Sequence, residues 1–194
     1  MTDKKIPFVG LHAHSVAGSI FDAIGYPNEH MDFCYENGGE ALALTDHGNM
    51  NGFSHQFLHW QKMKEEGKEF KPIFGVEAYF LPSIDEWHDD YDRIKEDAKL
   101  AKSLAKQGDT SGATVEDEDA SKKAIKSVIN RRRHLVLLAQ NQTGLNNLFK
   151  LISESYREEN FYRYPRVDYK LLAKYSEGVI ASSACLGGPY AGNY

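Results

Sequence analysis

The sequence predicts an α/β fold in which short apolar strands alternate with amphipathic helices. Five apolar runs bounded by turn residues recur along the chain, at 6–10, 41–45, 71–81, 134–139 and 178–183. Helical periodicity between most of these runs favours a parallel sheet. Histidine, cysteine and acidic residues recur near the ends of the runs, where functional side chains gather in parallel α/β folds. Five strands do not close a barrel of the usual kind, so we expect an incomplete domain.

Size and composition limit the function classes. The chain has 194 residues, of which 41% are hydrophobic, and this suits one globular domain or a large part of a bigger one. Its net charge of −5 lacks the basic surplus of a domain that holds nucleic acid unaided. Two distant cysteines, with no secretory segment and no run long enough to span a membrane, predict a cytoplasmic protein.

The first run, at 6–10, leads into His12-Ala13-His14. Residues two apart in an extended backbone point to the same side, so both imidazoles can converge on one zinc, manganese or iron ion. An accidental His-x-His pattern is an equally good explanation of these residues alone. Asp22, in the loop that follows, is more simply a solvated or helix-capping carboxylate.

A helix over 27–37 should begin at Pro27 and end at Gly38-Gly39, with Cys34 as a core thiol. The apolar strand at 41–45 runs directly into Asp46 and His47, and a helix over 51–66 follows.

The strand at 71–81 carries Glu77 among apolar neighbours. A buried, unpaired charge is costly, so this carboxylate should be paired, neutralised or bound to metal. The alternative is an edge strand on which Glu77 faces solvent.

Residues 85–133 are rich in charged and small side chains. They predict an inserted, solvent-exposed pair of helices, at 92–106 and 121–132, with a flexible joint at 108–112.

The last third of the chain continues the alternation. The strand at 134–139 begins, rather than ends, with His134, and helices are expected over 145–156 and 167–174. Between these helices, aromatic residues alternate with Arg157, Arg163 and Arg166; such a segment can hold nucleic acid or pack a loop onto a barrel. The strand at 178–183 leads to Cys185.

Several motifs together resemble the PHP (polymerase and histidinol phosphatase) domain, in the version found at the N-terminus of the bacterial DNA polymerase III alpha subunit. They are His12-Ala13-His14-Ser15, Phe21-Asp22, Leu44-Thr45-Asp46-His47-Gly48-Asn49, Pro72-Ile73-Phe74-Gly75-Val76-Glu77-Ala78-Tyr79, Thr143-Gly144-Leu145-Asn146-Asn147-Leu148 after His134-Leu135, and Ser183-Ala184-Cys185-Leu186-Gly187. The resemblance implies a distorted seven-stranded β/α barrel, here incomplete at its C-terminus, with residues 1–194 as the N-terminal part of the domain.

The resemblance also implies up to three divalent ions, Zn²⁺ or Mn²⁺. His12, His14 and Glu77 would hold one ion, and Glu77 would bridge to a second, held also by His134 and Cys185. Asp22 and His47 would hold the third, and Asp46 would orient His47 from behind. Catalysis would act through the metal bound by His12, His14, His47 and Glu77. The Asp-x-His pair that normally completes the family's first and third ions is absent from this sequence.

The implied activity is metal-dependent phosphoester hydrolysis, with 3′→5′ exonuclease proofreading of DNA in the polymerase context. The implied partners are DNA, the rest of the polymerase beyond Tyr194, a proofreading subunit and the sliding clamp. Two alternatives stay open at this point: a stand-alone phosphatase acting on a small phosphomonoester, and a non-catalytic scaffold module of the polymerase.

Overall fold

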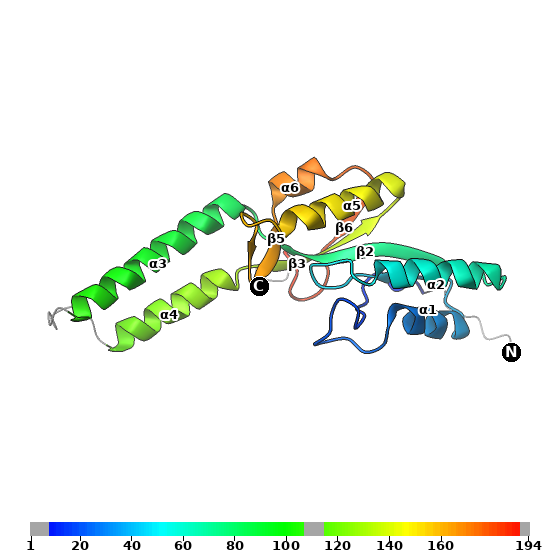
Figure 1. Ribbon diagram of the computed structural model, residues 1–194, viewed down its shortest axis with the longest axis horizontal. Helices are drawn as coiled ribbons and strands as arrows, with labels where there is room; N and C mark the ends of the chain where they lie inside the picture. The colour runs from blue at the N-terminus through cyan, green and yellow to red at the C-terminus, as the bar shows by residue number, and fades with distance from the viewer. Residues whose placement is uncertain (1–7, 107–114, 191–194) are drawn as a thin grey trace. The chain divides into compact units, whose positions relative to one another are not determined.

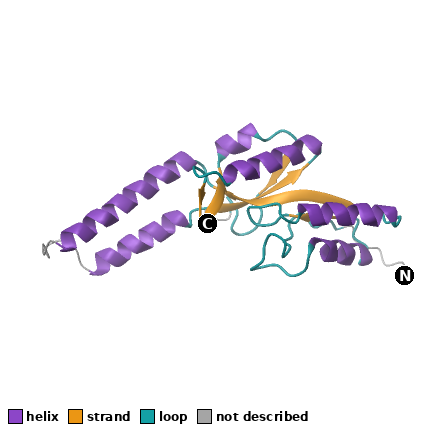
Figure 2. Ribbon diagram, in the orientation of Figure 1, coloured by secondary structure: helices purple, strands orange, loops and turns teal. Residues whose placement is uncertain are grey.

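The computed structural model describes residues 8–106 and 115–190, which form helices and strands in alternation. Figure 1 labels these elements, and Figure 2 distinguishes the helices from the strands by colour. The helices are α1 (Pro27–Glu36), α2 (Phe53–Glu65), α3 (Ile84–Lys106), α4 (Val115–Ile129), α5 (Gln142–Ser155) and α6 (Tyr169–Lys174). The strands are β1 (Ala41–Leu44), β2 (Lys71–Phe80), β3 (Arg133–Ala139), β4 (Phe161–Tyr162), β5 (Tyr164–Val167) and β6 (Val179–Ser182). The predicted α/β class is confirmed.

The sheet is mixed rather than parallel. Its strands run in the order β4-β5-β2-β3-β6, and β1 also pairs with β2. The pairs β1–β2 and β2–β5 are parallel, as predicted, whereas β3 runs antiparallel to both β2 and β6. The expected parallel pairing is therefore confirmed for β1–β2 and β2–β5 and is wrong for β3, because hydrophobic periodicity identifies a strand without giving its direction.

The direction of β3 explains the unusual place of His134. In the antiparallel register, His134 lies opposite Tyr79, and Val136 lies opposite Glu77. The start of β3 therefore lies beside the end of β2, and residues two apart on a strand share a face. A histidine at the beginning of β3 thus reaches the face of the sheet that carries Glu77.

Two apolar clusters hold this sheet and its helices together. Val76, Ala78, Phe80 and Leu137 of the central strands pack against Leu148 and Leu151 of α5. Met31 of α1 and Met63 of α2 pack against Leu42 and Leu44 of β1. The ring of Phe53 in α2 contacts both Phe74 of β2 and Phe149 of α5, so α2 and α5 cover the same face of β2, and Glu77 lies on the other face.

Residues 81–132 form a compact unit of their own, separate from the unit made by residues 1–80 and 133–194. Its two helices lie side by side and antiparallel (Figure 1), and both begin earlier than the sequence predicts. Ser83 accepts a hydrogen bond from the backbone N–H of Glu86, and the indole of the buried Trp87 donates to the carbonyl of Val128. The predicted joint at 108–112 lies outside the described residues.

Two other segments differ from prediction. The predicted strand at 6–10 is described only from Phe8 onward. Within it, Gly10 forms a single parallel bridge with Leu42. The aromatic and basic segment after α5 forms the short hairpin β4–β5. No helix within the described ranges is long and apolar enough to cross a lipid bilayer.

Candidate metal centre

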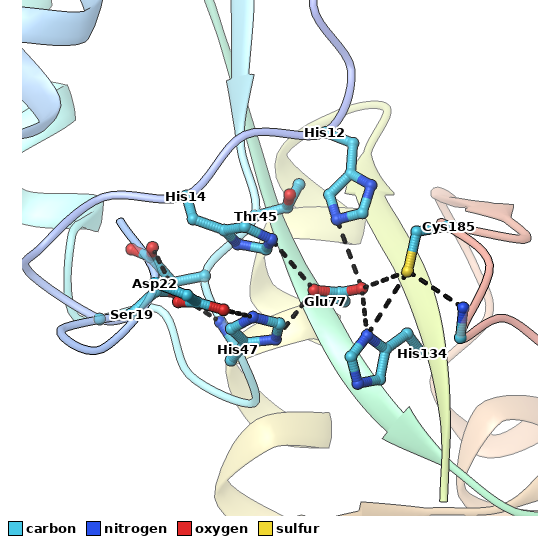
Figure 3. A network of polar contacts seen from close by, with 12 residues as sticks. His12, His14, Ser19, Asp22, Thr45, His47, Glu77, His134 and Cys185 are labelled. Atoms are coloured by element: carbon cyan, nitrogen blue, oxygen red, sulfur yellow. Dashed lines mark hydrogen bonds and ion pairs between the residues drawn. The ribbon is translucent and has the colours of Figure 1, made fainter. Parts of the chain in front are cut away.

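Glu77 is the centre of a group of imidazoles (Figure 3). Its side chain is fully buried, and four histidines approach its two carboxylate oxygens. Oε1 lies 3.3 Å from Nε2 of His12 and 2.9 Å from Nδ1 of His134. Oε2 lies 3.2 Å from Nε2 of His14 and 2.9 Å from Nδ1 of His47. The alternative of a solvent-facing Glu77 is therefore wrong.

Three chain segments deliver these histidines. The segment that carries His12 and His14 follows the edge of β1, where the N–H of Ala43 donates to Gly10 and the N–H of Thr45 donates to Ala13. His47 follows β1 and forms an isolated parallel bridge with Glu77, whose N–H donates to the carbonyl of Asp46. His134 comes from the antiparallel strand β3.

Cys185 and Asp22 extend the group on opposite sides (Figure 3). The Cys185 sulfur lies 3.7 Å from Nδ1 of His134 and 3.9 Å from Oε1 of Glu77. The Asp22 carboxylate lies 2.6 Å from Nε2 of His47 and is half exposed. The structure thus brings together all seven side chains that the resemblance implies as metal ligands.

The electrostatics of the group follow from its contacts. Burial alone would raise the pKa of Glu77, but the imidazoles of His14, His47 and His134 outweigh it and hold that pKa well below the usual range. The Glu77 carboxylate raises the pKa of His47, against the effect of burial, and Asp22 adds to the rise. Without a bound cation, the Glu77 carboxylate and the His47 imidazole stabilise each other's charged forms.

Four buried atoms of the group make no hydrogen bond of good geometry, although three of them take part in the close contacts above. They are Nε2 of His12, Nδ1 of His14, Nδ1 of His47 and Oε2 of Glu77. Buried polar atoms normally satisfy their hydrogen-bonding capacity, so this concentration needs a physical cause. Nitrogen and carboxylate donors directed at one small volume are the first coordination shell of a divalent ion. The residues present therefore fit a metal.

Two sets of donors lie close enough together to hold an ion, and Glu77 belongs to both. One set is His12, His14 and Glu77, and the other is His47, Glu77 and His134. The first set matches the arrangement implied by the resemblance. The second differs from it, because His47 joins Glu77 and His134, whereas Cys185 is farther from the carboxylate.

Asp46 does not contact the ring of His47 in the described hydrogen bonds. Its carboxylate accepts hydrogen bonds from the backbone N–H and hydroxyl of Ser15 and from the hydroxyl of Ser19. The motifs include Asp46 and Ser15, but they gave no signal for Ser19 or for the contact of both serines with Asp46, which lies about 30 residues later in the chain.

The arginines considered for nucleic acid have different environments. Arg166 is fully buried, and its Nη1 donates to the carbonyls of Tyr162 and Tyr164, so the hypothesis of a phosphate contact is wrong for this residue. Arg157 is exposed and paired with Glu154, at 3.0 Å. Arg163 lies exposed between β4 and β5 with a positive φ of 60°. The remaining nucleic-acid hypothesis therefore concerns Arg157 and Arg163.

The sequence interpretation missed Tyr79. Its ring stacks on His47, with centroids 6.0 Å apart and planes within 3°, and it lies 5.6 Å from the ring of His134. The alternation of a strand could have identified it, since Tyr79 shares the face of Glu77 two residues earlier.

Comparison with known proteins agrees with the geometry. DNA polymerase III subunit alpha of Aquifex aeolicus is 35% identical over 181 residues, which cover 93% of this chain and 12% of that protein. The subunit of the same name from Helicobacter pylori strain 26695 is 37% identical over 153 residues, or 79% of this chain and 9% of that protein. The chain thus spans about one eighth or less of the length of these relatives.

A crystal structure of a protein assigned as a metal-dependent phosphoesterase, from Bifidobacterium adolescentis, covers 76% of this chain and 32% of its own, with a TM-score of 0.39 and 10% identity. The model of the PHP domain family matches residues 10–191, which include every residue of the histidine group. The chain therefore belongs to the PHP domain family.

Proposed function

We propose that this chain is the PHP-domain part of a bacterial-type DNA polymerase III alpha subunit, and that its histidine group binds divalent ions and hydrolyses phosphoesters. The observation that carries the proposal is the buried Glu77 carboxylate, which lies within 3.3 Å of four imidazoles. A carboxylate shared by two donor sets is suited to bridge two ions.

The bound ions would supply a water of lowered pKa and neutralise the charge of a phosphoester. The protein's own residues orient and shield the donors. Glu77 approaches all four imidazoles from a rigid central strand, and Tyr79 stacks on His47 and limits rotation of its ring. The site requires no side-chain nucleophile.

We propose Zn²⁺ or Mn²⁺ as the ions. Imidazole-rich sites suit zinc, and carboxylates also suit manganese. Cys185 favours zinc at the His134 side, because a thiolate is a soft ligand.

The proposed substrate is the 3′ end of a DNA strand, cleaved in the 3′→5′ direction. The support is the similarity to polymerase alpha subunits along nearly the whole chain. It follows that the rest of the polymerase, the DNA it holds, a proofreading subunit and the sliding clamp are the proposed partners, and that the proposed location is the cytoplasm.

The test is degradation of a 5′-labelled single strand by the longest native protein that carries this chain, loaded with Mn²⁺ or Zn²⁺. We expect stepwise shortening from the 3′ end that His47→Ala and Glu77→Gln each abolish. The matched control is Glu66→Gln, since Glu66 is an exposed carboxylate paired with Lys68 away from the histidine group. Metal binding without DNA degradation would overturn the nuclease proposal and favour a small phosphomonoester or a scaffold role.

A further inference from the structure

We propose that Ser19 is a positioning residue that holds Asp22 against His47. It acts through a buried arrangement of Ser15, Ser19 and Asp46, here called the Asp46 clasp. This inference rests on the proposed metal-binding function and assigns a role to two serines that are not themselves candidate ligands.

The Asp46 carboxylate is the hub of the clasp. Its side chain is 3% exposed, and it accepts three hydrogen bonds from the loop that precedes α1. The Ser15 N–H donates to Oδ1 at 2.6 Å, the Ser15 hydroxyl donates to Oδ2 at 2.8 Å, and the Ser19 hydroxyl donates to Oδ1 at 2.9 Å. A buried carboxylate is stable only with such partners, so the loop and the end of β1 are tied together.

Ser19 connects this hub to both members of the Asp22–His47 pair. Its hydroxyl oxygen accepts a hydrogen bond from the backbone N–H of His47 at 3.0 Å. Its carbonyl accepts from the N–H of Asp22 at 3.3 Å, which fixes the short turn from 19 to 22. One residue therefore sets the backbone on both sides of the 2.6 Å contact between the Asp22 carboxylate and Nε2 of His47.

The loop packs closely against the clasp at Gly18. A Cβ added to Gly18 would overlap the side chains of Asn49 and Asp46. The Asn49 side-chain amide donates to the carbonyls of both Gly18 and His47, at 2.9 Å each. The absence of a side chain at Gly18 thus lets the loop backbone lie directly against the residues that follow β1.

Apolar burial does not hold this loop. Ile20, Phe21 and Ile24 are 72%, 101% and 85% exposed, respectively. A loop with so little buried apolar surface should depend on its polar contacts for a fixed position. The clasp is the set of buried polar contacts that supplies it.

The test compares Ser19→Ala with Ser155→Ala in the full chain. Both serines are buried, but the Ser155 hydroxyl donates only to Ile152 within α5. Titration with Mn²⁺, followed by calorimetry, measures the metal affinity. In Ser19→Ala, the affinity of the binding step that involves Asp22 and His47 should fall about tenfold or more, as is common when a residue that supports a metal ligand is changed. Ser19→Thr keeps the hydroxyl and should restore most of the affinity, while Ser155→Ala should bind as wild type does.

A second measurement needs no metal. Amide hydrogen exchange in the metal-free protein should become faster at His47 and through residues 16–24 in Ser19→Ala, and should not change there in Ser155→Ala. If wild type binds no metal, the proposed function fails, and this measurement alone decides the role of Ser19. Unchanged exchange at His47 and in the loop of a folded Ser19→Ala protein would overturn the inference, and so would unchanged Mn²⁺ affinity if wild type binds.

Discussion

The histidine group and the helical unit of residues 81–132 place charged residues in opposite ways. In the histidine group, residues from 12 to 185 converge on one fully buried carboxylate. In the helical unit, ion pairs such as Asp90–Arg131 and Asp90–Arg93 are exposed. A buried charge must be compensated by neighbours brought from across the fold, whereas exposed pairs contribute little and need no such assembly. The difference indicates that the histidine group is built to bind a ligand.

The largest expected difference between the two regions is their response to metal. A ligand present at 100 times its dissociation constant stabilises the native state by about 2.7 kcal/mol. The chain has two tryptophans, Trp60 in α2 and Trp87 in α3, so each unit carries its own fluorescent reporter. We expect Mn²⁺ or Zn²⁺ to shift the urea unfolding transition of a Trp87→Phe variant, reported by Trp60. The urea midpoint that Trp87 reports in a Trp60→Phe variant should not change. An equal shift of both midpoints would contradict the proposal that the two units respond differently to metal.

Val128→Ala should weaken the helical unit without affecting the metal centre. Val128 is 3% exposed, and removal of its two methyl groups should lower the stability of this unit by about 1.5 kcal/mol. Denaturation followed by Trp87 fluorescence measures this loss. Leu100→Ala is the control, since Leu100 is 60% exposed and its truncation should change little. A weaker metal affinity in Val128→Ala would show that the two regions are coupled.

The metal-free and metal-bound proteins should depend on pH in opposite directions. The pKa of Glu77 is lowered from 4.5, so its contribution to stability is present above that pH and is lost as the pH falls through the folded-state value. The pKa of His47 is raised from 6.5, so its contribution is present below that pH and is lost as the pH rises through the folded-state value. The histidine group should therefore stabilise the metal-free protein most between about pH 4.5 and 6.5.

Metal binding should strengthen above this range, because ligating imidazoles must be neutral. Urea unfolding at pH 6 and pH 8, with and without Mn²⁺, measures both trends. A metal-free protein whose stability rises from pH 6 to pH 8 would argue against the charge pairing described for His47.

Removal of the helical unit should have the smallest effect on the metal centre. Phe80 and Arg133 are directly paired in the antiparallel register of β2 and β3, so an Asn-Gly turn can join them in place of residues 81–132. We expect the shortened chain to bind Mn²⁺ within about twofold of the intact chain, since His134 keeps its register opposite Tyr79. A folded shortened chain that has lost metal binding would show that residues 81–132 belong to the site.

The sequence predicted those parts that depend on local pattern. The helix that begins at Pro27 and the strands that carry Leu44 and Val76 follow from capping residues and apolar periodicity. The antiparallel direction of β3 could not be predicted, because periodicity is the same for both directions. The resemblance identified His134, but only the register of β3 explains how this residue reaches Glu77.

The contacts of Ser15 and Ser19 with Asp46, which support the histidine group, could not be predicted from the sequence. Ser15 and Ser19 contact Asp46 only after the loop folds onto the end of β1, and the motif that contains Ser15 does not indicate this contact. For Arg166, the sequence suggested a contact that the structure does not support. An arginine among aromatic residues is typical of a nucleic-acid contact, but Arg166 is fully buried. In both cases the missing information was a long-range contact.

The central claim is that one carboxylate serves two metal ions, and the number of ions bound by Glu77→Gln tests it most directly. Mass spectrometry of the metal content of dialysed protein, with His47→Ala for comparison, provides the measurement. We expect Glu77→Gln to lose both ions together, because Glu77 belongs to both donor sets, and His47→Ala to keep the ion held by His12, His14 and Glu77. Retention of a full complement of ions by a folded Glu77→Gln protein would contradict the account.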